Sequence, residues 1–171
     1  MSGRALIGSV VLAGALLLLV PDSAFAWGPA THTQIGLEVL RSLDLFPPSI
    51  AAVLARHPIE FLYGGLAADI SMAKKYAPVG RHCHHWHVAR EIYATAGDDG
   101  PLKSAMTGYL CHLAADVLAH NTFVPRMLTL TSSTRALGHS YWEHRMDVDV
   151  GAEYAQLARW IVTRFDHSRT D

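Results

Sequence analysis

The 171 residues carry a formal net charge of −1 and are half apolar, so the chain can form the core of one domain but offers no broad basic surface for a polyanion. Eleven histidines stand against three lysines, and most of the histidines lie in clusters that also contain aspartate, glutamate or tryptophan. The two cysteines, Cys83 and Cys111, exclude a disulfide scaffold but leave open either one bridge or buried thiols near a metal site.

The first 26 residues have the layout of a secretory signal peptide. Arg4 precedes an apolar run over 5–20, and Ala-Phe-Ala at 24–26 is a small-residue cleavage site. The run is somewhat short for a membrane span, although an uncleaved anchor is the alternative. We therefore expect export to the periplasm or the medium after cleavage following Ala26, with a mature domain over 27–171.

Helical periodicity and helix breakers predict the elements of the mature chain. Thr31 is expected to cap a helix over 31–43 with His32 on its inward face, and the two prolines at 47–48 precede a helix over 49–56. An apolar segment over 61–70 follows, whose glycines allow close backbone approach, and then a helix opens at 82–87 and continues to about 96. A turn at 97–101 precedes a central helix that ends near Asn121 and Pro125. The last expected elements are a loop over 129–137, a helical stretch from 138 and a helix over 151–165. Strand-type alternation is absent, so the predicted fold class is all-α, a single-domain helical bundle.

Three polar residues recur at every fourth position of the central helix: His112, Asp116 and His120. This spacing places them on one stripe of a helix. The residues beside the stripe are apolar, which predicts that the helix is buried. They are Leu102, Met106, Leu110, Leu113, Val117 and Leu118. Two imidazoles and a carboxylate facing the same way indicate a divalent metal site; the alternative is a solvated polar face, which would normally carry lysine or glutamate.

Three further clusters carry side chains of metal-ligand type. His139 and Glu143 form another i, i+4 pair, although such pairs also occur on solvated helices. The group at 82–87 places several histidines around Trp86, and at most one or two of them could bind a metal at once. Asp69 lies in an apolar segment and needs a partner there, which could be a metal, a helix terminus or an arginine.

Five motifs in this order resemble the zinc-dependent phospholipase C family. They are Trp27-Gly-Pro-Ala-Thr-His32, Gly64-Gly-Leu-Ala-Ala-Asp69, His84-His85-Trp86, Gly108-Tyr-Leu-x-His112-x-x-x-Asp116-x-x-x-His120, and His139-x-x-x-Glu143. The same order is similar to the catalytic domain of glycosylphosphatidylinositol-specific phospholipase D and, more distantly, to the single-strand-specific zinc nucleases. The resemblance covers nearly the whole mature chain.

The resemblance implies a helical fold that holds up to three zinc ions. By this resemblance, the first ion would be bound by Trp27, His32 and Asp116. The second would be bound by Asp69, His84 or His85, His112 and Asp116, and the third by His120, His139 and Glu143. Asp116 would bridge the first two ions. Trp27 would bind through its own amine and carbonyl oxygen, and this amine exists only after cleavage. Asp69 would also serve as the general base near the attacking water.

Two details of these motifs differ between branches of the family. His120 follows Asp116 by four residues, as in the phospholipase D-like branch, whereas the secreted bacterial phospholipases have a spacing of six. This weakens any inference of substrate from the bacterial enzymes. His85-Trp86 matches one branch and His84-x-Trp86 another, so the choice between the two histidines stays open.

The expected function is that of an exported zinc-dependent phosphodiesterase, with phospholipase C action on glycerophospholipids favoured. Zinc lowers the pKa of a bound water to about 7, which supplies a hydroxide nucleophile, and imidazole ligands suit zinc better than magnesium. A single-strand-specific zinc nuclease is one alternative, disfavoured because no basic stripe would follow a nucleic acid backbone. A non-catalytic exported zinc-binding protein is another. The expected partner is therefore a phospholipid or another phosphodiester, with peripheral membrane contact and oligomeric state left open.

Overall fold

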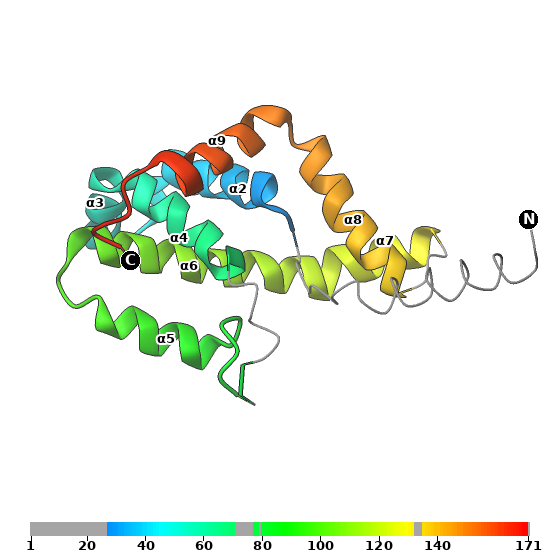
Figure 1. Ribbon diagram of the computed structural model, residues 1–171, viewed down its shortest axis with the longest axis horizontal. Helices are drawn as coiled ribbons and strands as arrows, with labels where there is room; N and C mark the ends of the chain where they lie inside the picture. Colours follow the sequence, from blue (N-terminus) through cyan, green and yellow to red (C-terminus); the bar gives the residue numbers. More distant parts are fainter. Residues whose placement is uncertain (1–26, 71–76, 79, 132–134, 171) are drawn as a thin grey trace, which may run out of the picture.

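The computed structural model describes residues 27–70, 77–78, 80–131 and 135–170, and these residues form helices joined by short connections, without a strand (Figure 1). The elements are α2 (Pro29–Arg41), a 3₁₀ turn (Leu43–Leu45), α3 (Pro48–Arg56), α4 (Pro58–Ile70), α5 (Trp86–Thr95), α6 (Gly100–Leu118), a π-helical turn (Ala119–Phe123), α7 (Val124–Thr131), α8 (Arg135–Asp149) and α9 (Ala152–Arg164). The predicted all-α fold is confirmed. The predicted signal peptide lies outside the described residues.

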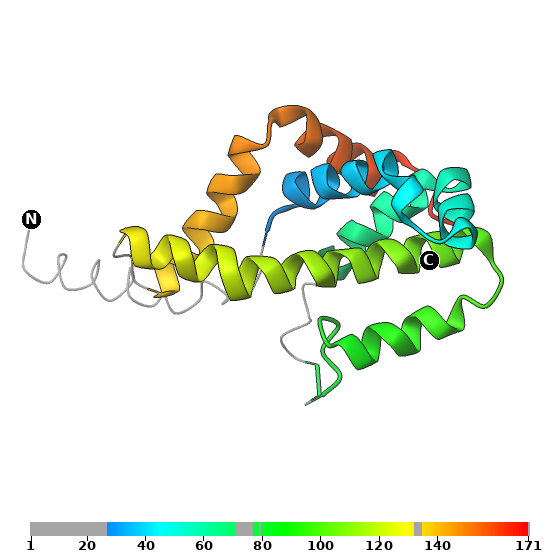
Figure 2. The same ribbon diagram turned by 180° about the vertical axis from the view of Figure 1, so that it is seen from behind.

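The longest helix among the described residues, α6, runs through the middle of the molecule, with α5 on one side and α2 and α9 on the other (Figures 1 and 2). Its start is capped by Asp99, whose Oδ1 accepts a 2.9 Å hydrogen bond from the backbone N–H of Leu102. Pro101 occupies the first turn, where a missing N–H leaves no helical hydrogen bond unmade. The two stripe residues lie in the second half of α6, away from this capped end, and α4, α5 and α2 pack against the helix.

Helices α4 and α6 touch backbone to backbone at two glycines. A Cβ on Gly64 would lie 1.7 Å from the carbonyl oxygen of Ala105, and a Cβ on Gly108 would lie 1.8 Å from that of Phe61. No side chain fits in either place, so the glycines set the distance between the two helices. The close approach brings the C-terminal half of α4, which carries Asp69, alongside the polar stripe of α6.

Replacing Gly108 with alanine is therefore expected to lower the free energy of unfolding by about 3 kcal/mol or more, because overpacking here forces two backbones apart. Gly65→Ala is the matched control: its Cβ would meet the Gly108 oxygen at 3.7 Å, an ordinary contact. Urea unfolding of both variants measures the difference. Equal stability of the two variants would contradict this account of the α4–α6 contact.

Two apolar clusters surround this helix pair. One joins α3, α4 and α9, and its buried members are Leu54, Phe61, Leu62, Leu66, Ala158 and Ile161. The other lies between α4, α5 and α6, and its buried members are Ala68, Ala89, Tyr109 and Leu113. The polar stripe of α6 is thus enclosed by packed helices rather than set on an open surface. Among the described residues, no helix has the length and apolarity needed to cross a membrane.

The start of the first described helix was predicted wrongly. Thr31 does not cap it, since α2 begins at Pro29 with Gly28 at the N-cap position and Thr31 lies inside the first turn. The Thr31 hydroxyl and backbone N–H instead bind the carboxylate of Asp147 on α8. A partner so distant in the chain leaves no local pattern from which the cap could be predicted.

The end of the central helix and the loop over 129–137 were also predicted wrongly. After α6 the chain continues through the π-helical turn into α7, where Pro125 lies in the first turn and does not break the helix. Helix α7 extends to Thr131. The hydroxyls of Thr129 and Thr131 bond back within it, at 2.9 and 2.7 Å, to carbonyl oxygens four residues earlier, so they do not compete with the helix by forming a turn. Helix α8 begins at Arg135, and 132–134 lie outside the described residues.

The predicted burial of α6 fails at its C-terminal end. Leu113 is buried, whereas Val117 is 42% and Leu118 60% exposed. Figures 1 and 2 show the reason: this end of α6 extends past α4 and α5. The apolar flank of the stripe is therefore enclosed at His112 and open near His120.

Candidate metal centre

The stripe of α6 forms the floor of a buried polar cluster. His112 is 1% and Asp116 6% exposed, which excludes a solvated face at these two positions. His112 Nε2 lies 3.2 Å from Asp116 Oδ2. On the other side of its ring, His112 Nδ1 donates a 2.8 Å hydrogen bond to the carbonyl oxygen of Gly65 on α4. This bond fixes the tautomer, so the lone pair of Nε2 faces the cluster.

Three more segments bring side chains to the same place. From α2, His32 Nε2 lies 3.4 Å from Asp116 Oδ1, and its ring stacks on that of His112 with centroids 3.9 Å apart. From the loop before α5, His84 Nε2 lies 3.1 Å from Oδ1 of Asp69 on α4. The same His84 nitrogen is 3.4 Å from Asp116 Oδ2 and 3.2 Å from His112 Nε2. Five predicted ligands are thus brought together.

The spacing of these atoms fits a shared metal ion. In two overlapping sets, every ligand atom lies within 4.8 Å of the others; the sets are His32, Asp69 and His112, and His84, His112 and Asp116. Ligand atoms bound at about 2.0–2.2 Å to a tetrahedral zinc ion lie a little over 3 Å apart, close to the separations observed. Two imidazoles with a carboxylate are a donor set that zinc accepts readily.

Buried polar atoms in the cluster point to the same conclusion. Within the described part of the chain, His32 Nε2 and both carboxylate oxygens of Asp116 are buried without a hydrogen-bond partner. A buried group in this state costs about 1–3 kcal/mol or more, so such atoms call for an explanation. A cation between the two side chains would satisfy all three atoms.

The electrostatics of the cluster favour bound positive charge. Burial opposes ionisation of Asp116, but the neighbouring His112 and His32 outweigh it and hold the pKa of Asp116 below its ordinary value. Burial likewise opposes the charged form of His112, but Asp116 and Asp69 outweigh it and raise the pKa of His112. Burial lowers the pKa of His32, and Asp116 offsets only part of this effect. The carboxylate stays ionised, and the pair Asp69 and Asp116 attracts a cation.

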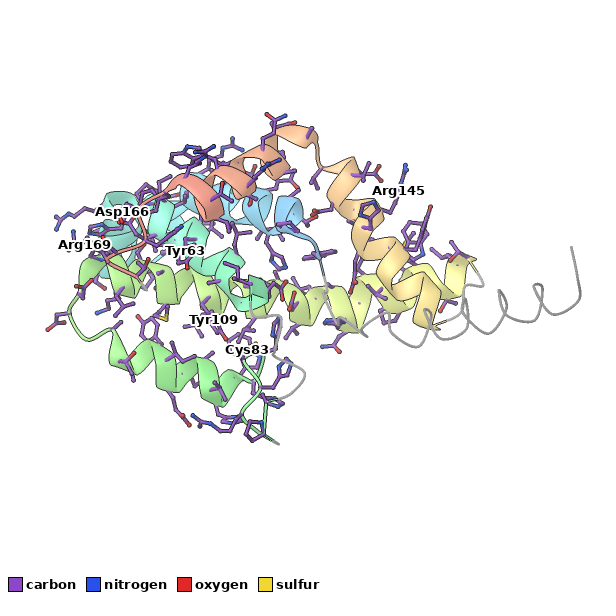
Figure 3. All side chains as sticks on the ribbon, in the orientation of Figure 1. Tyr63, Cys83, Tyr109, Arg145, Asp166 and Arg169 are labelled. Atoms are coloured by element: carbon purple, nitrogen blue, oxygen red, sulfur yellow. The ribbon has the colours of Figure 1, made fainter. Side chains whose placement is uncertain are left out.

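The loop that carries His84 is fixed by contacts with α4 and α6. Tyr109 on α6 donates a 2.6 Å hydrogen bond from its hydroxyl to the carbonyl oxygen of Cys83, and both residues are labelled in Figure 3. The Cys83 thiol lies 3.6 Å from the carbonyl oxygen of Ala68 and 3.3 Å from His84 Nδ1. Cys83 and Cys111 are not joined to each other, so the disulfide left open by the sequence is not formed.

The neighbouring His85 is directed elsewhere. It is exposed, and its ring stacks on that of His87 with centroids 5.4 Å apart. The structure therefore brings His84, and not His85, into the cluster.

The remaining predicted ligands lie around the cluster. Trp27 is half-buried beside His32, with ring centroids 6.5 Å apart. Glu143 is buried on α8, and His120 is half-buried in the π-helical turn. His139 lies in α8, but its side chain is outside what the structure describes. Among the described side chains, neither ligand set of the cluster includes His120 or Glu143.

The cluster can be reached through two clefts. The larger, of about 600 Å³, lies between α4, α8, α9 and the start of α2, with His32, Asp69 and Glu143 among its lining residues. Its wall on α9 is largely apolar, and Arg159 is the one lysine or arginine among the lining residues described. The smaller, of about 320 Å³, is lined by His84, Asp116 and His120. A substrate in either cleft would meet the ligand cluster directly.

Three positioning contacts were missed by the sequence analysis. The carbonyl of Gly65 orients His112, the hydroxyl of Tyr109 holds the loop of His84, and Asp147 binds the start of α2. The first two have no recognisable pattern because each joins segments far apart in the chain. The third also joins distant segments: the sequence shows only that Asp147 continues the four-residue spacing of His139 and Glu143, not that it caps α2.

A helical domain that gathers imidazoles and carboxylates from four segments at a buried point, reached through clefts, is typical of a metal-dependent enzyme. A family model described as zinc dependent phospholipase C matches residues 31–167. The chain belongs to the zinc-dependent phospholipase C family, which confirms the resemblance seen in its motifs. It is therefore a phosphodiester hydrolase of phospholipase C type, and its family implies zinc as cofactor and a phospholipid as substrate. Comparisons with curated proteins and with solved structures give no match.

Proposed function

We propose that the protein is an exported phospholipase C that cleaves glycerophospholipids between the glycerol oxygen and the phosphate. The observation that carries the proposal is the convergence of His32, Asp69, His84, His112 and Asp116, whose ligand atoms approach one another to 3.1–3.8 Å. Bound zinc would lower the pKa of a water to about 7 and neutralise charge on the phosphate.

We assign the ligands in three sets. Trp27 and His32 would hold one zinc and share Asp116 with a second, which Asp69, His84 and His112 would complete. The separations of 3.4 Å from Asp116 Oδ1 to His32 and from Oδ2 to His84 support such a bridge, because each oxygen faces a different imidazole. For the third zinc we assign His120, His139 and Glu143, which lie on the helical segments that follow Asp116.

The residues of the chain have separate tasks in the reaction. Asp69 lies at the larger cleft, where its carboxylate could accept the proton of the attacking water. Gly65 holds His112 in one tautomer, and Tyr109 holds the loop of His84, so both imidazoles are oriented before a substrate arrives. The apolar side chains that surround the cluster lower the local dielectric and strengthen its hold on the phosphate.

A phospholipid fits the larger cleft better than a nucleic acid does. The apolar wall on α9 includes Ala155, Ala158 and Val162, which suit the glycerol ester and acyl portions of a lipid. Arg159 on the same helix could meet the phosphate from the cleft side. A single described arginine is too little positive charge to follow a polynucleotide backbone.

Export would give the N-terminus a chemical role. The layout of residues 1–26 supports cleavage after Ala26, which would leave Trp27 with a free amine next to His32. The mature domain would then cover 27–171. Because a free amine is a metal ligand and an amide nitrogen is not, one zinc site would form only in the processed chain.

Zinc analysis and substrate assays on two forms of the protein test the proposal. We expect the chain that begins at Trp27 to bind two or three zinc ions and to release phosphorylated headgroup from phosphatidylcholine. The chain that retains residues before Trp27 is expected to bind one zinc fewer and to lose most activity. Zinc well below two per processed chain, or no hydrolysis with zinc bound, would contradict the proposal. Faster cleavage of denatured DNA would instead favour a zinc nuclease.

A further inference from the structure

The start of α2 is held by a carboxylate from another helix. Asp147 on α8 accepts a 2.7 Å hydrogen bond at Oδ1 from the backbone N–H of Thr31 and one of 2.9 Å from the Thr31 hydroxyl. Its Oδ2 accepts a 3.2 Å bond from the N–H of Ala30. The N-cap residue Gly28 has no side chain to serve these groups. Asp147 thus caps α2 from across the molecule and carries negative charge to the positive end of its dipole.

The fit around this carboxylate is tight. A Cβ on Gly28 would lie 2.4 Å from the carboxylate carbon of Asp147, so the backbone of α2 sits directly against it. The first turn of α2 closes here, with the N–H of His32 donating a 3.1 Å hydrogen bond to the carbonyl oxygen of Gly28. The position of this turn is therefore set by α8.

The same turn carries a member of the metal centre. His32 follows Thr31 directly, and it is buried with its ring stacked on His112 and its Nε2 3.4 Å from Asp116. Asp147 also lies one helical turn after Glu143 on α8, and both line the larger cleft together with His32. A shift of the first turn of α2 would move His32 away from Asp116.

We propose that Asp147 is a positioning residue of the zinc centre: its carboxylate holds the first turn of α2 so that His32 meets Asp116. This inference rests on the zinc centre of the proposed function, but not on the reaction catalysed there. It assigns to Asp147 a task beyond helix stability, since the cap it forms places a metal ligand.

Two capping aspartates allow a matched test. Asp147→Ala removes the cap of α2, and Asp99→Ala removes the cap of α6, where Asp99 receives the N–H of Leu102 on a turn that carries no predicted ligand. Both variants are expected to lower the Tm of the metal-free protein. Only Asp147→Ala is expected to weaken zinc binding, by about 10- to 100-fold, as measured by competition with a chromophoric chelator without substrate. Asp147→Asn, which keeps one acceptor oxygen, is expected to recover part of the affinity.

The outcomes separate a positioning role from a structural one. If Asp147→Ala and Asp99→Ala lower Tm alike and both keep the zinc affinity of the unsubstituted protein, the proposal is overturned. Should Asp147→Ala fail to fold, Thr31→Val removes only the 2.9 Å hydroxyl bond and keeps the side-chain volume, and unchanged zinc affinity in this variant overturns the proposal as well. If the unsubstituted protein binds zinc but does not hydrolyse phospholipid, the proposed reaction is contradicted. The zinc-affinity test of Asp147 still applies in that case.

Discussion

Replacing Asp69 with asparagine is expected to lower kcat by about 10²- to 10⁴-fold while most of the bound zinc stays in place. Asparagine keeps the size of the side chain and one oxygen that can remain a ligand, but it cannot take a proton from water. Asp69 lies at the larger cleft, and its Oδ1 is 3.1 Å from His84 Nε2. The loss should therefore fall on turnover more than on metal content.

The measurement pairs steady-state hydrolysis of phosphatidylcholine with zinc analysis of the same samples. Glu38→Gln is the control, because it removes one negative charge from an exposed site on α2 where Glu38 pairs only with the exposed Arg41 among the described residues. Its kcat should match that of the unsubstituted protein. Turnover by Asp69→Asn within a few-fold of the unsubstituted enzyme would contradict the role of general base. An unsubstituted protein that binds zinc and shows no turnover would instead indicate sequestration.

The part of the centre that helical periodicity alone predicted is the part that one helix determines. His112 and Asp116 are four residues apart on α6, and helical geometry alone places them together, as their 3.2 Å separation confirms. Helical spacing does not predict where the side chain of His120 points, because His120 lies in the π-helical turn. There the hydrogen bonds run from i to i+5, so the rotation per residue changes and the spacing no longer fixes a direction.

The parts that could not be predicted depend on contacts between distant segments. His84, and not His85, turns inward from a loop that the bond from Tyr109 to the carbonyl of Cys83 holds, and this bond joins residues 26 apart. The cap of α2 depends on Asp147, 116 residues from Thr31. Tertiary packing decides both, whereas periodicity and capping rules describe only near neighbours along the chain.

The second large effect is a loss of zinc affinity, which we expect when His84, but not the adjacent His85, is replaced with alanine. His84→Ala should weaken zinc binding by about 100-fold or more, since loss of a direct ligand should exceed the 10- to 100-fold typical of residues that only orient one. His84 Nε2 lies within 3.4 Å of both carboxylates and of His112, so its loss removes the imidazole of this loop that contacts all three. kcat/KM for phosphatidylcholine should fall at least in parallel, because the same side chain would hold the ion that meets the phosphate.

His85→Ala provides the matched control from the next position in the chain. His85 is exposed and stacks on His87, so its loss should change zinc affinity and kcat/KM by less than about 2-fold, within the range of ordinary surface substitutions. Chelator competition and steady-state kinetics on both variants give the comparison. A loss of zinc confined to His85→Ala would mean that the loop holds the opposite histidine inward when metal is bound. In that case the hydrogen bond from Tyr109 to Cys83 would not orient the metal ligand of this loop, and Tyr109→Phe should leave zinc affinity unchanged. If His84 is the ligand, Tyr109→Phe should weaken zinc binding.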